Sequence, residues 1–465
     1  MQRNLIILIY VGIISTIIGY TLTTKTHAST TLDEQLQTAI EAHALTPHTK
    51  PTTDPAQVQL GRLLFYDKIL SGNRDISCAT CHRTTNFGTG DGLPVSIGTG
   101  GNGISTERTL GHDRELVPRN ATELFDRGAA EWTSMFWDSR LVQRPDQRFA
   151  SPAHEQLPGG LDNILAAQAM FPVTSADEMR GRPGDRDVFG AVNEVGTIDA
   201  NNFTGIWSKL MQRLLAIPEY RTLFASTYPD TAPQDLNFAH AANAIAAFEI
   251  DTFTFTNSPW DQYLRGDTTA LLDEAKQGGI LFYGKANCAT CHSGNLFTDQ
   301  QHYNIVVPQI SPGKGDAAPL DLGRFGITRD ENDRFAFRTP PLRNVTLSGP
   351  YMHNGTFVSL ESAIRHHLEP EHSLRAYDVS EHLPLIFQST FQNDPELLDD
   401  MLATLDSVAP TEELTESEIH AIATFLEALT DPAAMSLDVT PDTVPSGLLV
   451  SDEITQIYLP MAQMH

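Results

Sequence analysis

The chain contains two copies of a pentapeptide whose residue types can attach a haem and ligate its iron. Cys-Ala-Thr-Cys-His occupies residues 78–82 and again residues 288–292, and the two copies hold all four cysteines of the 465 residues. In this spacing, two thiols can add to the two vinyl groups of one haem, and the adjacent histidine can bind its iron. The sequence therefore predicts two covalently bound haem c groups, attached and proximally ligated by Cys78, Cys81, His82, Cys288, Cys291 and His292.

Two other kinds of site are built from paired cysteines, and both fit this chain poorly. A zinc ribbon has its cysteine pairs roughly 15 to 20 residues apart, whereas Cys78 and Cys288 are separated by 210 residues. A redox dithiol does not need a histidine after each pair. We therefore expect haem sites at both motifs.

The first 28 residues have the features of a secretory signal. An apolar run extends from Leu5 to Leu22, and Thr26-His27-Ala28 provides a small-residue cleavage site after Ala28. The run is also long enough to leave an N-terminal membrane anchor open, because about 18 apolar residues nearly span a bilayer. Either alternative predicts a periplasmic or exported protein, and the four cysteines used for haem leave none for a disulfide.

The acidic composition limits the classes of partner. The formal net charge is -27 at pH 7, which argues against nucleic acid and anionic lipid. The same charge favours a small, basic electron-donor protein through long-range steering.

The residues before each motif share a local pattern. Gly61–Tyr66 and Gly279–Tyr283 both end in Leu-Phe-Tyr. An amphipathic helix leading into each haem motif would give this pattern, although two unrelated apolar helix ends would also give it. Strand-like alternation is sparse. We predict a mainly α fold of two tandem cytochrome c-like haem domains with long loops and little β structure. The expected boundaries are a signal peptide (1–28), an N-terminal haem domain with inserted loops (29–235), a C-terminal haem domain (236–430) and an extended tail (431–465).

Several further segments resemble the bacterial dihaem cytochrome c peroxidase family, to which the protein-oxidising enzyme MauG also belongs. The resemblance spans most of residues 55–430 and implies an oxidoreductase that reduces hydrogen peroxide to water, with electrons entering through the C-terminal haem. Two alternatives remain: a MauG-like oxidase of a partner protein or aromatic substrate, and a dihaem electron carrier. The segments that carry the resemblance are residues 60–82, 91–98, 136–140, 258–264 and 338–355.

The resemblance places the peroxide reaction at the N-terminal haem. It implies that Glu178 is the catalytic acid-base and Gln168 its hydrogen-bonding partner. Helical periodicity supports the position of Gln168, because it continues an apolar stripe, and Pro172 then ends the helix. Without the resemblance, Glu178 would be taken for a solvated loop carboxylate. The stripe consists of Leu161, Ile164, Leu165 and Gln168.

Many members of the family cap this haem with a loop histidine, and here the chain departs from the pattern. When the chain is aligned to the family pattern at residues 96–98, Thr99 occupies the position where the histidine is expected. An insertion of about 13 residues, Thr99 to Gly111, would instead leave His112 as the capping ligand, on a glycine-rich loop that moves easily. Two alternatives stay open: His112 caps the haem, or the haem is permanently open.

The second axial ligand of the C-terminal haem is predicted to be His367. In the family that the chain resembles, the corresponding position is a methionine in typical peroxidases and a tyrosine in MauG. His367 continues a helical stripe with Leu360, Ala363 and Ile364, whereas His366 is turned about 100° away. Met352 is nearby, but such a methionine more often packs in the core. Ligation by two histidines would make this haem more reducing than a His/Met haem.

The remaining site predictions follow from the resemblance. Trp137 corresponds to a tryptophan between the haems that could assist electron transfer, or to a core aromatic at the interface. His353 corresponds to a residue near the haem propionates. The implied partners are hydrogen peroxide and a small donor, a cytochrome c or a cupredoxin; a homodimer is left open. A calcium ion between the haems would be held by oxygen atoms of Asn120, Ser348 and Pro350.

Overall fold

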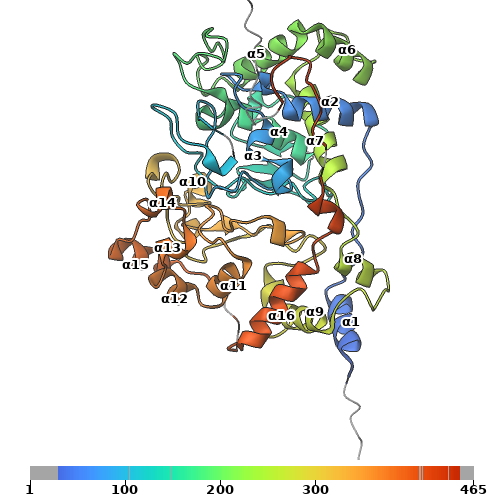
Figure 1. Cartoon of the computed structure of the whole chain (residues 1–465), viewed down its shortest axis with the longest axis vertical. Helices are drawn as coiled ribbons and strands as arrows, with labels where there is room; N and C mark the ends of the chain where they lie inside the picture. Colours follow the sequence, from blue (N-terminus) through green and yellow to red (C-terminus); the bar gives the residue numbers. More distant parts are fainter. Residues whose placement is uncertain are drawn as a thin grey trace, which may run out of the picture.

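The regular secondary structure of the described chain is mostly helical, with two small sheets (Figure 1). The computed structural model describes residues 30–450 except 104, 147, 408, 409, 411 and 438. The predicted signal peptide and the end of the predicted tail therefore lie outside the described residues. Within the described part, no helix combines the length and apolar character that a membrane span requires.

One core surrounds the first haem motif. It combines residues of the helices on either side of that motif with the later helix α7, and its packing buries Leu64, Phe65 and Phe248 almost completely. Polar residues begin several of these helices; Asp54, for example, accepts a hydrogen bond from the Ala56 N–H at 2.7 Å. The helices of this half are α2 (Pro55–Tyr66), α3 (Cys78–Cys81), α4 (Ile164–Ala169), α5 (Phe203–Ala216), α6 (Pro218–Thr227) and α7 (Phe238–Phe253).

A second core surrounds the second motif and includes the start of the described chain. Leu36 of α1 is buried there together with Phe282 and Phe425. Each core therefore contains a helix from the other side of the predicted boundary between residues 235 and 236. Helix α1 precedes this boundary but packs in the second core, and α7 follows it but packs in the first. The helices of this half are α1 (Leu32–Ala42), α8 (Pro259–Leu264), α9 (Asp273–Tyr283), α10 (Phe325–Thr328), α11 (Leu360–Leu368), α12 (Pro370–Arg375), α13 (Val379–His382), α14 (Leu385–Gln388), α15 (Pro395–Ala403) and α16 (Glu416–Glu427).

The same close helix crossing occurs in both halves. A Cβ added at Gly61 of α2 would lie 1.8 Å from the carbonyl oxygen of Ala244 in α7, and one added at Gly278 of α9 would lie 1.8 Å from that of Ala421 in α16. Only glycine allows two backbones to approach this closely. The structural equivalent of Gly61 is thus Gly278, which directly precedes the segment Gly279–Tyr283.

The described part of the C-terminal tail returns to the first half. In Figure 1 its red trace runs from α16 toward α2. The Ser446 hydroxyl donates a hydrogen bond to Asp67 at 2.6 Å, and Arg62 donates one to the Val439 carbonyl at 2.7 Å. The described tail therefore runs from the second half of the molecule to the first and packs against α2.

The two small sheets place residues between the halves. Strands β1 (Ser134–Met135), β2 (Leu141–Gln143) and β3 (Phe149–Ala150) are antiparallel in the order β1-β2-β3, with Met135 opposite Leu141 and Val142 opposite Ala150. Strands β4 (His302–Tyr303) and β5 (Phe337–Arg338) pair antiparallel, with His302 opposite Arg338. The turn between β1 and β2 carries Trp137, whose carbonyl accepts a hydrogen bond from the Arg338 N–H at 2.8 Å.

Candidate active site and haem cavities

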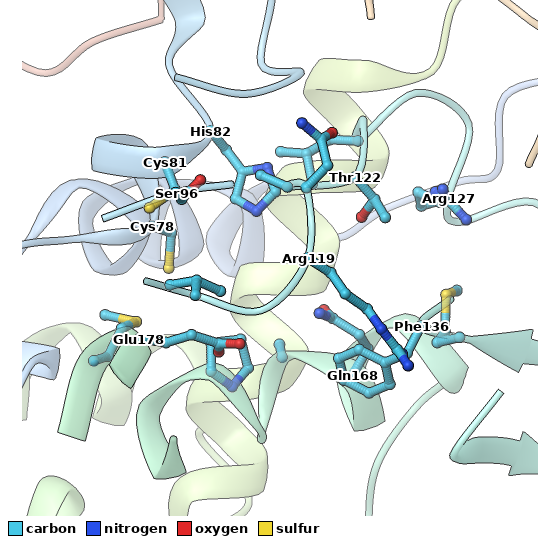
Figure 2. Close-up of a pocket in the computed structure, with 18 of the residues that line it drawn as sticks. Cys78, Cys81, His82, Ser96, Arg119, Thr122, Arg127, Phe136, Gln168 and Glu178 are labelled. Carbon is cyan, nitrogen blue, oxygen red and sulfur yellow. The ribbon is translucent and has the colours of Figure 1, made fainter. Parts of the chain in front are cut away.

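A cavity in the first half brings the first haem motif together with the predicted acid-base pair. It encloses about 1390 Å³ of space free of atoms, open solvent included, and is lined by Cys78, Cys81, His82, Gln168 and Glu178. Figure 2 shows His82 and the cysteines on one side, with Glu178 and Gln168 facing them from the other. A flat macrocycle held by His82 would therefore present its opposite face to the carboxylate and the amide.

Burial sets the protonation of the groups on the cysteine side. It lowers the pKa of His82 to about 4, so this imidazole is neutral at pH 7 and keeps a lone pair for a metal. Burial also raises the pKa of the Cys78 thiol to about 12. The donor set of two thiols and one neutral imidazole fits covalent attachment and proximal ligation of a haem.

Short helical turns carry the two polar groups on the opposite side. Gln168 lies on α4, which begins after Asn163, whose side chain accepts a hydrogen bond from the Ala166 N–H at 2.9 Å. The predicted stripe is thus shorter than expected, because Leu161 precedes the helix. Glu178 follows on a separate helical turn, Ala176–Arg180, which Ser175 caps through the Glu178 N–H at 3.4 Å.

Burial and nearby charges shift the pKa of the Glu178 carboxyl group in opposite directions. Burial raises its pKa, while the positive charges of Arg140 and Lys314 act in the other direction. A carboxyl whose pKa is raised toward neutrality by burial can both accept and return a proton, as a general acid-base must. Neither cation is a residue that the sequence predicted for the site.

His112 does not reach this cavity in the structure. Its side chain is 92 % exposed and pairs with the Asp113 carboxylate at 2.8 Å. The start of the inserted loop is nevertheless fixed beside the site, since the Thr99 N–H donates to the Glu178 carbonyl at 2.7 Å. The placement of His112 is that of a loop histidine, and the side of the cavity facing His82 has no histidine among its described lining residues.

A second cavity has a different ligand set. It encloses about 1500 Å³ of space free of atoms, open solvent included, and is lined by Cys288, Cys291, His292 and His367. The ring centroids of His292 and His367 lie 6.2 Å apart, with the ring planes at 62°. Two imidazoles that share one metal at bonds of about 2 Å place their ring centres roughly 6 Å apart. The pair therefore fits an iron between the two rings.

Hydrogen bonds orient both rings for this purpose. The Nδ1 atom of His292 lies 3.0 Å from the carbonyl of Phe297, and that of His367 lies 2.8 Å from the carbonyl of Ala363. Each ring thus keeps Nε2 for a metal, which is the usual arrangement of a ligating histidine. Burial, followed by the charge of His367, lowers the pKa of His292 to about 4.

The neighbouring histidine and methionine have different placements. His366 is fully buried, and its Nδ1 and Nε2 contact the Ser373 hydroxyl at 3.0 Å and the Ile305 carbonyl at 2.8 Å, so neither nitrogen is free for iron. Met352 lines the second cavity. Of the candidates, His367 is the one whose ring faces His292.

Four residues line both cavities and lie between them. One is Trp137, whose indole N–H donates to the Asn120 carbonyl at 3.2 Å. Another is Arg338, which the sequence singled out only as part of a segment; burial, followed by the charge of Arg127, lowers its pKa to about 9. The four are Asn120, Glu123, Trp137 and Arg338.

An orphaned buried histidine supports the presence of an anionic group in the second cavity. His353 lines it, stacks on Phe337 with ring centroids 3.5 Å apart, and has no hydrogen-bond partner at either ring nitrogen. Buried polar groups normally have partners. A haem propionate would supply one, in agreement with the resemblance.

The predicted calcium ligands also lie at this cavity. Asn120, Ser348 and Pro350 all line it. The Asn120 amide donates to the carbonyls of Leu93 and Pro94 at 3.2 and 3.1 Å, which leaves its side-chain oxygen available. Oxygen donors suit calcium. Among the described His, Cys, Asp and Glu residues, no group of three is arranged to hold a metal ion.

Comparisons with known proteins identify the family of the chain. The pattern of the family "Di-haem cytochrome c peroxidase" matches residues 55–269. The methylamine utilization protein MauG of Methylorubrum extorquens is 31% identical over 327 residues, which are 70% of this chain and 72% of MauG. The cytochrome c551 peroxidase of Pseudomonas aeruginosa is 30% identical over 313 residues, which are 66% of this chain and 70% of that enzyme.

A solved structure extends the similarity over most of the chain. A MauG-like protein associated with microbial copper homeostasis superposes with a TM-score of 0.58 and 26% identity, covering 86% of this chain and 97% of that one. The dihaem peroxidase BthA of Burkholderia thailandensis, at 20% identity and a TM-score of 0.51, shares the fold. The chain therefore belongs to the dihaem cytochrome c peroxidase family and is an oxidoreductase with two haem groups.

Proposed function

We propose that the protein reduces hydrogen peroxide to water at the N-terminal haem site, with electrons that enter through the C-terminal haem. The observation that carries this proposal is the unlike ligand set of the two cavities. His82 faces a carboxylate and an amide across the first cavity, whereas His292 faces His367 across the second. A haem bound by His82 would keep one face for a substrate, whereas a haem bound by both His292 and His367 would not.

In the first cavity, the haem supplies the iron that binds peroxide and accepts its oxidising equivalents. Glu178 accepts the proton of the near oxygen and returns it to the far oxygen, while Gln168 donates hydrogen bonds that orient the bound molecule. Two electrons and two protons convert each peroxide into two waters. Since His112 is exposed, we propose that this site is open in the state described here.

In the second cavity, His292 and His367 would hold the iron of a haem that relays electrons. Two such ligands would leave no position for peroxide, and two imidazoles give a lower potential than imidazole with thioether. Trp137 lines both cavities, so electrons passing between the haems would travel past its indole.

The finer features of this proposal rest on the sequence. We propose that each haem is attached by thioether bonds to its Cys-x-x-Cys-His motif in tandem cytochrome c-like domains, that residues 1–28 direct export to the periplasm, and that calcium binds at Asn120. The donor would be a small basic cytochrome c or cupredoxin, attracted by the net charge of -27. A MauG-like reaction has less support, because His367 stands where the resemblance places a tyrosine.

A redox titration followed by peroxide addition tests the proposal. We expect two haems of different potential, the lower one with the low-spin spectrum of two histidine ligands, and rapid oxidation of the reduced protein by peroxide. Turnover with a reduced cytochrome c or cupredoxin would follow. A protein that consumes no peroxide in any redox state would contradict the proposal.

A further inference from the structure

Lys314 belongs to the second half of the chain but lines the first cavity. Its loop is fixed at both ends: the Lys314 N–H donates to the Leu320 carbonyl at 2.9 Å, and the Ser311 N–H donates to the Thr390 carbonyl at 3.1 Å. Gly313 has a φ of +66°, and a Cβ there would lie 2.3 Å from the backbone of Pro319. The loop is therefore closely packed, and it holds the lysine at the cavity.

The carboxylates that influence Lys314 are already bound by arginines. Arg119 pairs with Asp138 at 2.7 Å and with Asp321 at 2.6 Å, and Arg140 pairs with Asp138 at 3.0 Å. The side chain of Lys314 has no hydrogen bond or ion pair within the described residues. Lys314 is half-buried at the cavity, and an ammonium group that is partly removed from water and has no bonded counter-ion would be stabilised by an anion in the cavity.

Lys314 and Glu178 line the same cavity, and the charge of Lys314 acts on the carboxyl group of Glu178. Lys314 and Arg140 are the two cations that oppose the rise in the pKa of Glu178. The guanidinium of Arg140 stacks 3.6 Å above the ring centre of Phe136, and Figure 2 shows Phe136 beside Gln168, across the cavity from His82. An anion attracted by Lys314 would therefore lie where the proposed substrate binds.

We propose that Lys314 binds the negatively charged atom of small ligands on this side and so stabilises the oxygen that leaves during peroxide cleavage. When the O–O bond breaks, the far oxygen departs with the bonding electron pair and takes the proton that Glu178 removed from the near oxygen. The near oxygen would then be reduced to the second water by two electrons from the donor, delivered through the haems, and two protons from solvent. Lys314 stabilises the charge on that oxygen until the proton arrives, and the first water is released. This role rests on the proposed reaction at the N-terminal haem.

The charge of Lys314 is present at neutral pH. Burial, followed by the charges of Arg140 and Arg119, lowers its pKa to about 8, while Asp138 and Asp321 oppose this change. Glu178 also faces it. The ammonium loses its proton as the pH rises through about 8, and its attraction for anions is then lost.

Fluoride binding to the oxidised holoprotein tests the inference without catalysis. The titration is followed by the absorbance of the N-terminal haem at about pH 6.5, with both haems oxidised. Lys314→Met should weaken fluoride binding by about tenfold or more, as expected for one lost charge near a buried anion. Lys314→Arg should remain within about threefold of the unsubstituted protein. Lys209→Met, which removes a charge from helix α5, should bind fluoride unchanged, because no residue of α5 is among those lining the first cavity.

The outcomes distinguish a failure of the Lys314 inference from a failure of the proposed function. Unchanged fluoride affinity in Lys314→Met, or no fluoride binding by the oxidised unsubstituted protein, would overturn the inference even if peroxide is consumed. A change in haem content or potential alone would assign Lys314 to a propionate and would also overturn it. If the unsubstituted protein consumes no peroxide, the proposed function fails, whereas a selective loss of fluoride affinity would still establish an anion site at Lys314.

Discussion

The rings of His292 and His367 face each other with centroids 6.2 Å apart, a spacing that suits one iron bound by both. Each ring is oriented by a backbone carbonyl at its Nδ1 atom, from Phe297 and Ala363. The second cavity is thus arranged for two imidazole ligands. Its redox properties are expected to follow from this pair.

Replacement of His367 by methionine should raise the potential of the C-terminal haem. A thioether stabilises the reduced iron relative to imidazole, and we expect a rise of at least about 0.1 V, within the roughly 0.8 V that axial ligands span. A spectroscopic redox titration measures it. His372→Met, an exposed position on α12, is the control and should leave both potentials unchanged. An unchanged potential in His367→Met would show that His367 is not a ligand.

Replacement of Glu178 by glutamine should remove most of the reaction with peroxide. The amide keeps the shape of the side chain but cannot carry the proton, so the second-order rate constant should fall by about 10²- to 10⁴-fold. Stopped-flow mixing with peroxide measures the rate, and the haem spectrum shows that both cofactors remain. Glu155→Gln, an exposed carboxylate, should react normally. A normal rate in Glu178→Gln would assign proton transfer to another group.

The pH dependence of this rate should have two limbs. Glu178 must be ionised to accept a proton, and burial raises its pKa, so the rate should fall as the pH falls through a value above the usual carboxyl range. Lys314 must be protonated, so the rate should fall again as the pH rises through about 8. Rate constants measured from about pH 5 to about pH 10 test both limbs. Lys314→Met should lose the alkaline limb but keep the acid limb.

Local sequence signals were enough to predict several parts of these sites. The motifs determine which thiols and histidines lie together, because they are adjacent in the chain. The helical period separates His367, which faces the second cavity, from His366, whose two ring nitrogens are occupied elsewhere. The mainly helical fold with little sheet is confirmed as well.

Other features depend on contacts between distant segments and leave no periodic signal. Lys314 lies in a loop of the second half yet lines the first cavity. Helix α1 precedes the first motif yet packs in the second core. The placement of His112 depends on how the inserted loop is held, and this loop contacts the Glu178 segment through Thr99.

Replacement of Trp137 by phenylalanine should slow turnover without slowing the peroxide step. Trp137 lines both cavities and is held by the Asn120 carbonyl, so its indole is the aromatic group placed between the two sites. Steady-state oxidation of a donor should fall, while the reaction of the reduced N-terminal haem with peroxide keeps its rate. Trp207→Phe, in the core of the first half, is the matched control. Equal turnover in the two variants would limit Trp137 to a packing role.

Replacement of Gly278 by alanine should destabilise the second core. The added Cβ would lie 1.8 Å from the Ala421 carbonyl oxygen, so α9 and α16 must move apart, at a cost of about 3 kcal/mol in the free energy of unfolding. Gly61→Ala should cost a similar amount, because the same approach to Ala244 occurs in the first core. Thermal unfolding of the holoprotein measures both losses. The control is Gly326→Ala in α10, where no described atom lies within 4 Å of the added Cβ and no loss is expected. If Gly278→Ala were as stable as Gly326→Ala, the close crossing of α9 and α16 would not contribute to the fold as described.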